Sequence, residues 1–296
     1  MSGAIDWLLL AEFSLVGLLS GGVLALIALG FVLVYKGTRV INFALGEFMM
    51  VGAYLFWTAN VFLALPWWAA LALTLAGVAA LGALVERFVL RPLAGQPVIS
   101  IVMATIGLGA VLHGLAEAVW GGANLSLPEL LPRKPLLLGE ILLPGQVLWS
   151  FALAVALIAA FTAYFRWSKD GVSMRAAASD PVTAYAMGID VRRTQRLTWM
   201  FAGVTGAVAG IIVASMTSLS PSLGTVALGV LAVVILGGLD SIAGAIVAGL
   251  IVGLLESLTV AFVGGQARDL VPYLVVLVIL MVRPYGLFGT RDIERL

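Results

Sequence analysis

The stretch FSLVGLLSGGVLALIALGFVLVY, residues 13–35, contains no charged side chain. A helix needs about 20 apolar residues to cross the hydrocarbon core of a bilayer. Similar runs recur along the whole chain, whose 296 residues are 62% hydrophobic and only 10% charged. Soluble domains carry about 25% charged residues, and a soluble fold could not cover this much apolar surface. The sequence therefore predicts an all-α polytopic membrane protein, with a single transmembrane domain over residues 1–296.

Eight to nine segments are predicted to be embedded in the membrane. The count varies because 41–62 contains Glu47 and because 223–239 is short and rich in glycine. With the N-terminus outside and the C-terminus inside, thirteen of the sixteen Lys and Arg residues lie in inside loops, as the positive-inside rule requires. The predicted segments are 13–35, 41–62, 66–88, 97–120, 145–165, 197–218, 223–239, 241–263 and 270–287.

Two loops are long. Residues 121–144 are predicted to be external and contain four prolines, whereas 166–196 are predicted to be cytoplasmic. In the predicted cytoplasmic loop, S-D-P at 179–181 is typical of a helix start, because Ser179 or Asp180 can cap and proline suits the first helical position. Gly188 suits a helix end, which predicts a short helix over 181–187. An apolar stripe of Val182, Tyr185, Ala186 and Ile189 indicates a partner in the cytosol, although an ordinary basic loop is the alternative.

Acidic residues in the apolar segments form a second group of candidates. Glu47 stands in INFALGEFMM (41–50), beside a helix face that carries Asn42 and Gly46. Carboxylates inside a membrane are costly and usually face a bundle interior or a wet path, but Glu47 can equally form a structural pair with a neighbouring helix. The same two interpretations apply to Glu256 and to the pair His113 and Glu117, one turn apart.

A further pattern is a short similarity between two segments of the chain. FALGEFMMVGAYL (43–55) and VALGVLAVVILGGL (226–239) share A-L-G and a later glycine. Many transporters contain structural repeats. In a chain this rich in Ala, Leu and Gly, an internal repeat and chance both remain open.

Several function classes find no support. The chain has no cysteine and a single histidine, so cysteine-based and multi-histidine metal sites are excluded. It lacks G-x-x-x-x-G-K-[ST], G-x-S-x-G and H-E-x-x-H, so neither ATP hydrolysis at a Walker site nor a hydrolase is predicted, and no catalytic residue is proposed. A net charge of +1 gives no reason to expect a nucleic acid partner.

Five motifs occur in one order along the chain: INFALGEFMMVGAY (41–54), TIGLG (105–109), MRAAASDPVTAYAMGID (174–190), GGLDSIAGAIVAG (237–249) and RPYGLFG (283–289). In this order, over nearly the whole chain, the sequence resembles LivH-like permease subunits of branched-chain (hydrophobic) amino acid ABC importers. Relatives often have histidine at the position of Leu45, glycine at Asp240 and proline at Ala243. The first departure puts any polar role at position 45 in doubt.

The resemblance implies a multi-pass permease of the bacterial inner (plasma) membrane that works by alternating access. Implied partners are a homologous second permease, two cytoplasmic ATPase subunits that bind ATP and Mg²⁺, and a periplasmic solute-binding protein. No cofactor is implied in this chain. The loop 166–196 then becomes a coupling segment that docks on the ATPase, and its family-matched residues are Arg175, Asp180, Ala184, Met187 and Gly188.

The hypothesis places the substrate path near Asn42, Gly46, Glu47, Thr105 and Gly107. Urea, amides and aromatic acids remain open as substrates, since related permeases handle them. One rival is an ion- or proton-coupled secondary transporter that uses Glu47, Glu117 and Glu256. A channel or membrane scaffold is a second rival, which saturable ATP-dependent uptake would eliminate.

Overall fold

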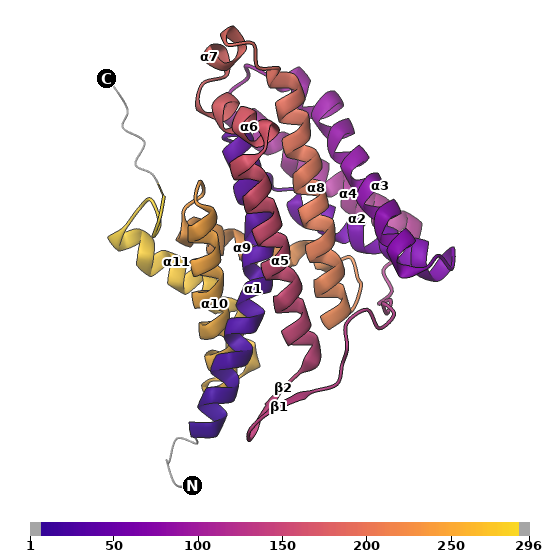
Figure 1. The fold of residues 1–296 in the computed structure, drawn as a ribbon, viewed down its shortest axis with the longest axis vertical. Coiled ribbons are helices and arrows are strands. Elements are labelled where there is room, and N and C mark those ends of the chain that lie inside the picture. Colours follow the sequence, from indigo (N-terminus) through magenta and orange to yellow (C-terminus); the bar gives the residue numbers. More distant parts are fainter. Residues whose placement is uncertain (1–6, 290–296) are drawn as a thin grey trace. The chain divides into compact units, whose positions relative to one another are not determined.

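The computed structural model describes residues 7–289, and most of them are helical, as predicted (Figure 1). The helices are α1 (Trp7–Thr38), α2 (Leu45–Trp57), α3 (Trp67–Val85), α4 (Val98–Trp120), α5 (Gly145–Trp167), α6 (Lys169–Ser179), α7 (Pro181–Ala186), α8 (Val191–Met216), α9 (Leu223–Gly237), α10 (Ile242–Phe262) and α11 (Val271–Val282). Short helical turns are η1 (Thr58–Phe62), η2 (Glu86–Leu90), η3 (Arg91–Leu93) and η4 (Gly265–Leu270). The loop 121–144 contains one antiparallel hairpin, β1 (Leu136–Leu138) with β2 (Ile141–Leu143). The predicted sides of the membrane for the two termini concern residues 1–6 and 290–296, which lie outside the described residues.

Within residues 7–289, seven helical segments are long and apolar enough to cross a membrane. They are Trp7–Thr38, Trp67–Leu93, Val98–Trp120, Gly145–Trp167, Val191–Met216, Ile242–Phe262 and Gly265–Val282. The two other predicted segments form shorter helices: α2, which continues into η1, and α9 with 15 residues. At 1.5 Å per residue α9 is about 22 Å long, less than the hydrocarbon core of a bilayer.

The helices form two compact units. Unit 1 consists of the described parts of 1–28, 131–157 and 229–296, and unit 2 of 29–130 and 158–228. In unit 1, α1 and α10 pack through two glycine pairs spaced by four residues. A Cβ on Gly17 would lie 2.8 Å from the Gly253 carbonyl oxygen, and one on Gly21 2.6 Å from that of Gly249. Small residues at this spacing let helix backbones approach closely. Such packing matters in a membrane because the hydrophobic effect does not drive helices together in lipid.

Unit 2 is organised around α2, which is buried against α8 and α3. Phe48, Met49 and Tyr54 are among its fully buried side chains. Gly52 and Gly210 let α2 and α8 approach, since a side chain at either position would overlap the facing helix. The Tyr54 ring stacks on Trp120 of α4 with centroids 4.9 Å apart. This packing places the start of α2 inside the bundle.

Candidate functional site

The first candidate site is the start of α2. After α1 the chain is non-helical until Leu45, and Asn42 organises this segment by accepting a hydrogen bond from the Ala44 N–H through Oδ1, at 3.0 Å. The Phe43 N–H donates to Thr105 Oγ1 at 3.3 Å, and Leu45 packs near Gly206. Thr105 and Gly206 lie in the interior of α4 and α8, so α2 begins partway along these helices.

Three glycines bring the backbones together here. A Cβ on Gly46 would overlap the carbonyl group of Gly224, at the start of α9. A Cβ on Gly224 would lie 2.6 Å from Oε1 of Glu47, and one on Gly109 would lie 3.6 Å from the Glu47 Cγ. The first turns of α2 and α9 therefore meet around the Glu47 side chain, with α4 on another side.

Polar groups at this site form a row. The Glu47 side chain is 16% exposed, and its Oε2 lies 3.4 Å from Nδ1 of His113. The imidazole Nε2 lies 3.7 Å from Oε1 of Glu117, whose side chain is 54% exposed. Glu47 stands in the first turn of α2, where the positive end of the helix dipole favours a carboxylate. Nδ2 of the buried Asn42 has no hydrogen-bond partner within residues 7–289.

Four of the five predicted path residues come together. Asn42, Gly46, Glu47 and Thr105 line the start of α2, whereas Gly107 is exposed and a Cβ there would meet nothing within 4 Å. The sequence reasoning did not include Gly109, Gly224 or the contact between Glu47 and His113. The spacing of Thr105, Gly109 and His113 was a usable signal, because residues four apart share one face of a helix.

The second candidate site is the loop 166–196, where the predicted short helix is confirmed as α7. The Asp180 carboxylate caps it by accepting hydrogen bonds from the N–H groups of Val182 and Thr183, at 2.9 and 3.1 Å. Pro181 occupies the first helical position, and Gly188 after the helix has a φ of +85°. A left-handed backbone of this kind suits glycine, so the chain turns sharply towards α8.

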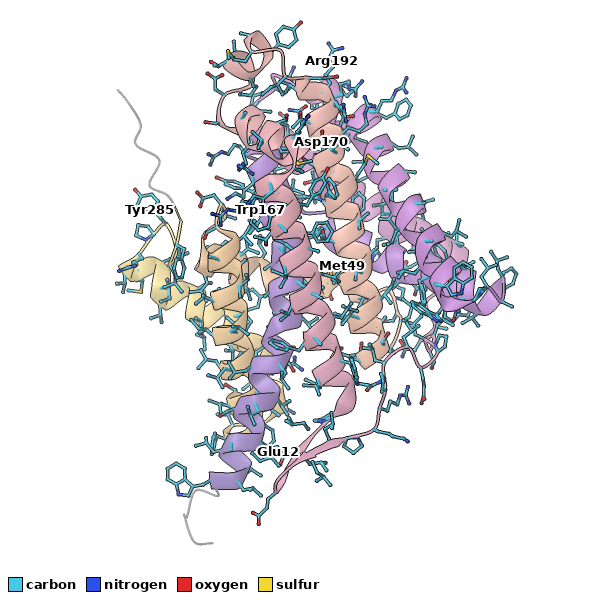
Figure 2. The ribbon with its side chains drawn as sticks, viewed as in Figure 1. Glu12, Met49, Trp167, Asp170, Arg192 and Tyr285 are labelled. Carbon is cyan, nitrogen blue, oxygen red and sulfur yellow. The ribbon has the colours of Figure 1, made fainter. Side chains whose placement is uncertain are left out.

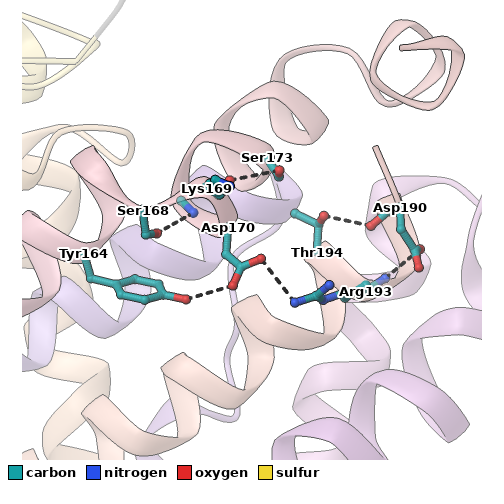
Figure 3. Close-up of polar contacts among 9 residues, drawn as sticks. Tyr164, Ser168, Lys169, Asp170, Ser173, Asp190, Arg193 and Thr194 are labelled. Carbon is teal, nitrogen blue, oxygen red and sulfur yellow. Dashed lines mark hydrogen bonds and ion pairs between the residues drawn. The ribbon is translucent and has the colours of Figure 1, made fainter. Parts of the chain in front are cut away.

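Helix α6 is tied to the helices on either side of it. Asp170 accepts hydrogen bonds from the Tyr164 hydroxyl at the end of α5, at 3.2 Å, and from Nη2 of Arg193 in α8, at 3.5 Å (Figure 3). The Arg175 guanidinium donates to the carbonyl groups of Phe165 and Arg166, which are among the last of α5. Carbonyls at a helix C-terminus lack partners within the helix and carry partial negative charge. Arg175 therefore fastens α6 to α5.

The predicted coupling residues consequently have different surroundings. Ala184 is buried, Asp180 and Gly188 shape the two ends of α7, and Arg175 points back to α5. Met187 alone of the five is a large exposed apolar side chain, and Val182 and Tyr185 are exposed beside it in sequence. We call Val182, Tyr185 and Met187 the α7 face. Asp170 and Arg192 lie at the same end of unit 2, whereas Met49 lies between helices (Figure 2).

Replacing Asp180 by Ala is expected to loosen α7 selectively. The hydroxyl and N–H of Thr183 hydrogen-bond to the Asp180 carboxylate and lower its pKa. A lowered pKa means that the cap stabilises α7 above the ordinary aspartate range, about pH 3.9, and that this contribution is lost as pH falls through the lower, folded value. Hydrogen exchange of the intact protein at neutral pH should show faster exchange over 181–187 in Asp180→Ala and little change in Asp180→Asn, which still accepts hydrogen bonds.

The matched control is Asp190→Ala, which removes the cap of α8. It should speed exchange at the start of α8 and leave 181–187 unchanged. Equal exchange over 181–187 in wild type and Asp180→Ala would show that the carboxylate does not hold α7.

Comparison with known proteins identifies the family. The family described as the branched-chain amino acid transport system permease component matches residues 14–280. The permease BraD of a high-affinity branched-chain amino acid transport system of Pseudomonas aeruginosa is 28% identical, over 94% of this chain and 95% of its own. Escherichia coli LivH, of a system with the same description, is also 28% identical over 94% of this chain and 95% of its own. A probable LivH of Methanocaldococcus jannaschii is 28% identical over 75% of this chain and 72% of its own. The chain belongs to the branched-chain amino acid transport system permease family.

Proposed function

We propose that the chain is the membrane permease of an ATP-driven importer for branched-chain or other hydrophobic amino acids. It works beside a homologous second permease, above two cytoplasmic ATPases and below a solute-binding protein. Nine helices lie in the bacterial inner membrane, namely the seven long segments together with α2 and α9, and the N-terminus is outside. The observation that carries the proposal is the apolar α7 face, whose three side chains are mostly exposed, next to helix α6, which is hydrogen-bonded to α5 and α8.

The start of α2 supports a transport path at this place. A helix that begins inside a bundle places the positive end of its dipole there, a device that membrane transporters use for carboxylate groups. Nδ2 of Asn42, which has no hydrogen-bond partner within residues 7–289, supplies a donor, and Gly46, Gly109 and Gly224 let the starts of α2 and α9 and the Glu47 side chain lie close together. A small amphiphilic amino acid suits this mixture of donors and apolar walls.

The contacts around α6 supply a mechanical connection for alternating access. A displacement of α7 by its partner would move α6, and α6 would move α8 through the hydrogen bond between Asp170 and Arg193. Helix α8 packs closely against α2 at Gly52 and Gly210. Because packed helices move as discrete bodies, closure of the ATPases would shift α8 and with it the start of α2.

Gentle solubilisation of the tagged protein from its native membrane tests the proposal. Two proteins should co-purify with it: an ATPase that contains a Walker motif, and a second, homologous permease. Both should be lost when residues 173–189 are scrambled. Vesicles containing the whole complex should take up leucine only when supplied with ATP and the binding protein. A protein that purifies alone from membranes still competent for uptake would contradict the proposal.

Glu47→Gln is expected to lower the transport rate at least tenfold with no loss of complex assembly. The substitution keeps size but removes the charge that faces His113 and the first turn of α9. Uptake in vesicles and co-purification of partners should be measured on the same preparation. Glu117→Gln, at the exposed end of the row, is the control and should change uptake little. Failure of Glu47→Gln to assemble would instead assign the carboxylate a structural role.

A proton-coupled transporter is a second candidate, because Glu47, His113 and Glu117 form a carboxylate–imidazole–carboxylate row. Rows of this kind carry protons in pumps and transporters. Uptake that collapses with a protonophore while ATP is held constant would favour this candidate. The α7 face has no purpose in such a transporter.

A further inference from the structure

Unit 1 contains a cavity of about 310 Å³, separate from the residues at the start of α2. It lies between the beginning of α1 and the end of α10, and Pro144 and Arg268 complete its lining. Glu12, near the beginning of α1, is one of its lining residues (Figure 2). The volume is at the lower end of the range for small-molecule sites, about 300–1,000 Å³.

The charged groups in this cavity use only part of their binding capacity on one another. Nε of Arg268 donates to Oε2 of Glu256 at 2.9 Å, and the two side chains are 54% and 12% exposed. Within residues 7–289 the two Nη groups of Arg268 and Oε1 of Glu256 make no hydrogen bond, and Glu12 forms no ion pair. A guanidinium can bind a carboxylate or phosphate through two parallel N–H groups, so a strong anion-binding fork remains available.

The rest of the lining is apolar. Phe13 and Val16 of α1 and Val260 of α10 line the cavity. Ser257 also lines it, but its hydroxyl already donates to the Phe13 carbonyl at 2.7 Å, so it supplies little further polarity. The cavity thus combines one cationic group and two carboxylates with a wall for an aliphatic chain.

We propose that this cavity binds a small zwitterion that carries an ammonium and an anionic group close together, next to an apolar chain. The anionic group binds the Arg268 fork, and the ammonium binds the carboxylates of Glu256 and Glu12. A solute with only an anion meets two carboxylates beside the guanidinium, and one with only an ammonium leaves the Arg268 fork without an anion to bind. Free aliphatic amino acids and aminophospholipids both have this chemistry.

For the free amino acid, the inference rests on the proposed function and extends it. Arg268 belongs to the part of the chain predicted to lie outside, where the binding protein releases its solute. The cavity would then receive the amino acid before it reaches the start of α2. Its affinity should depend on both charged ends of the solute.

The test uses the whole complex in phosphatidylcholine nanodiscs, without binding protein, titrated with L-leucine by calorimetry. Val16→Trp fills the cavity and leaves the ion pair intact, and it should weaken binding at least tenfold. Arg268→Lys keeps the charge but loses the fork, and it should weaken binding as well. Lys134→Gln removes an exposed positive charge that does not line the cavity, and its affinity should equal that of wild type. N-acetyl-leucine and leucine amide, which each lack one charge, should bind at least tenfold more weakly than leucine.

A second arm distinguishes the two sources. Nanodiscs that contain phosphatidylethanolamine are prepared, and bound lipid is identified by mass spectrometry. Retention of phosphatidylethanolamine by wild type and its loss in Val16→Trp, with no heat from leucine, would assign the site to the lipid headgroup. If neither leucine nor phosphatidylethanolamine distinguishes wild type from Val16→Trp, the inference is wrong. ATP-driven leucine uptake by the wild-type complex is measured in parallel, so that failure of the proposed function is seen separately.

Discussion

Gly46→Val should abolish leucine uptake and lower the yield of folded protein. Its Cβ would overlap the Gly224 carbonyl, a backbone group that no side-chain rotation can move away. Overpacking of this kind costs about 1–3 kcal/mol, and more where the backbone cannot shift. The start of α2 would be pushed from that of α9, which deforms the proposed path. Size-exclusion profiles, the thermal unfolding midpoint in detergent and vesicle uptake should be measured together.

Two other glycines provide controls for this result. A Cβ on Gly77 of α3 would lie 3.6 Å from Leu55, an ordinary contact, so Gly77→Ala should behave as wild type. Gly224→Ala is an intermediate case, because its Cβ would meet the flexible Glu47 carboxylate. It should fold but transport poorly. Normal uptake by Gly46→Val would show that the two helix starts do not need to meet.

Met187→Arg should abolish ATPase association, and with it at least 99% of uptake, while the protein still inserts and folds. Met187 is 78% exposed, so a charged side chain there meets solvent in the isolated permease and costs no packing. In the complex the same charge would be buried against the partner, where an unpaired charge is strongly unfavourable. Co-purification with the ATPase, uptake and the unfolding midpoint are the measurements.

The matched control makes the same kind of change elsewhere. Leu137 on the hairpin is 71% exposed, and Leu137→Arg should leave ATPase association intact. If Met187→Arg still retains the ATPase and transports normally, α7 is not the docking element.

Local features were predictable from the sequence, and long-range pairings were not. The helix start at S-D-P needs only Asp180, Pro181 and Gly188, which act on their own backbone, so it could be read directly. By contrast, Glu47 meets His113 of a different helix. Helices that are apolar on every face give little indication of which neighbour each face meets.

Two assignments show how finely position matters. TIGLG contains both Gly107 and Gly109. Residues two positions apart in a helix point in directions about 200° apart, so of these two glycines only Gly109 faces Glu47. Arg175 was predicted as a docking residue because it matches the family motif. The carbonyls that it binds at the end of α5 lie outside that motif, so a motif alone could not reveal them.

In α7, the residues that determine the backbone path differ from those that form the exposed surface. Asp180, Pro181 and Gly188 determine the path of the backbone, whereas the side chains of the α7 face are almost fully exposed. Substitutions in Val182, Tyr185 and Met187 can therefore accumulate during evolution without disturbing the bundle. If the α7 face is the docking surface, a new ATPase could be selected through these three side chains while the helices around the start of α2 stay unchanged.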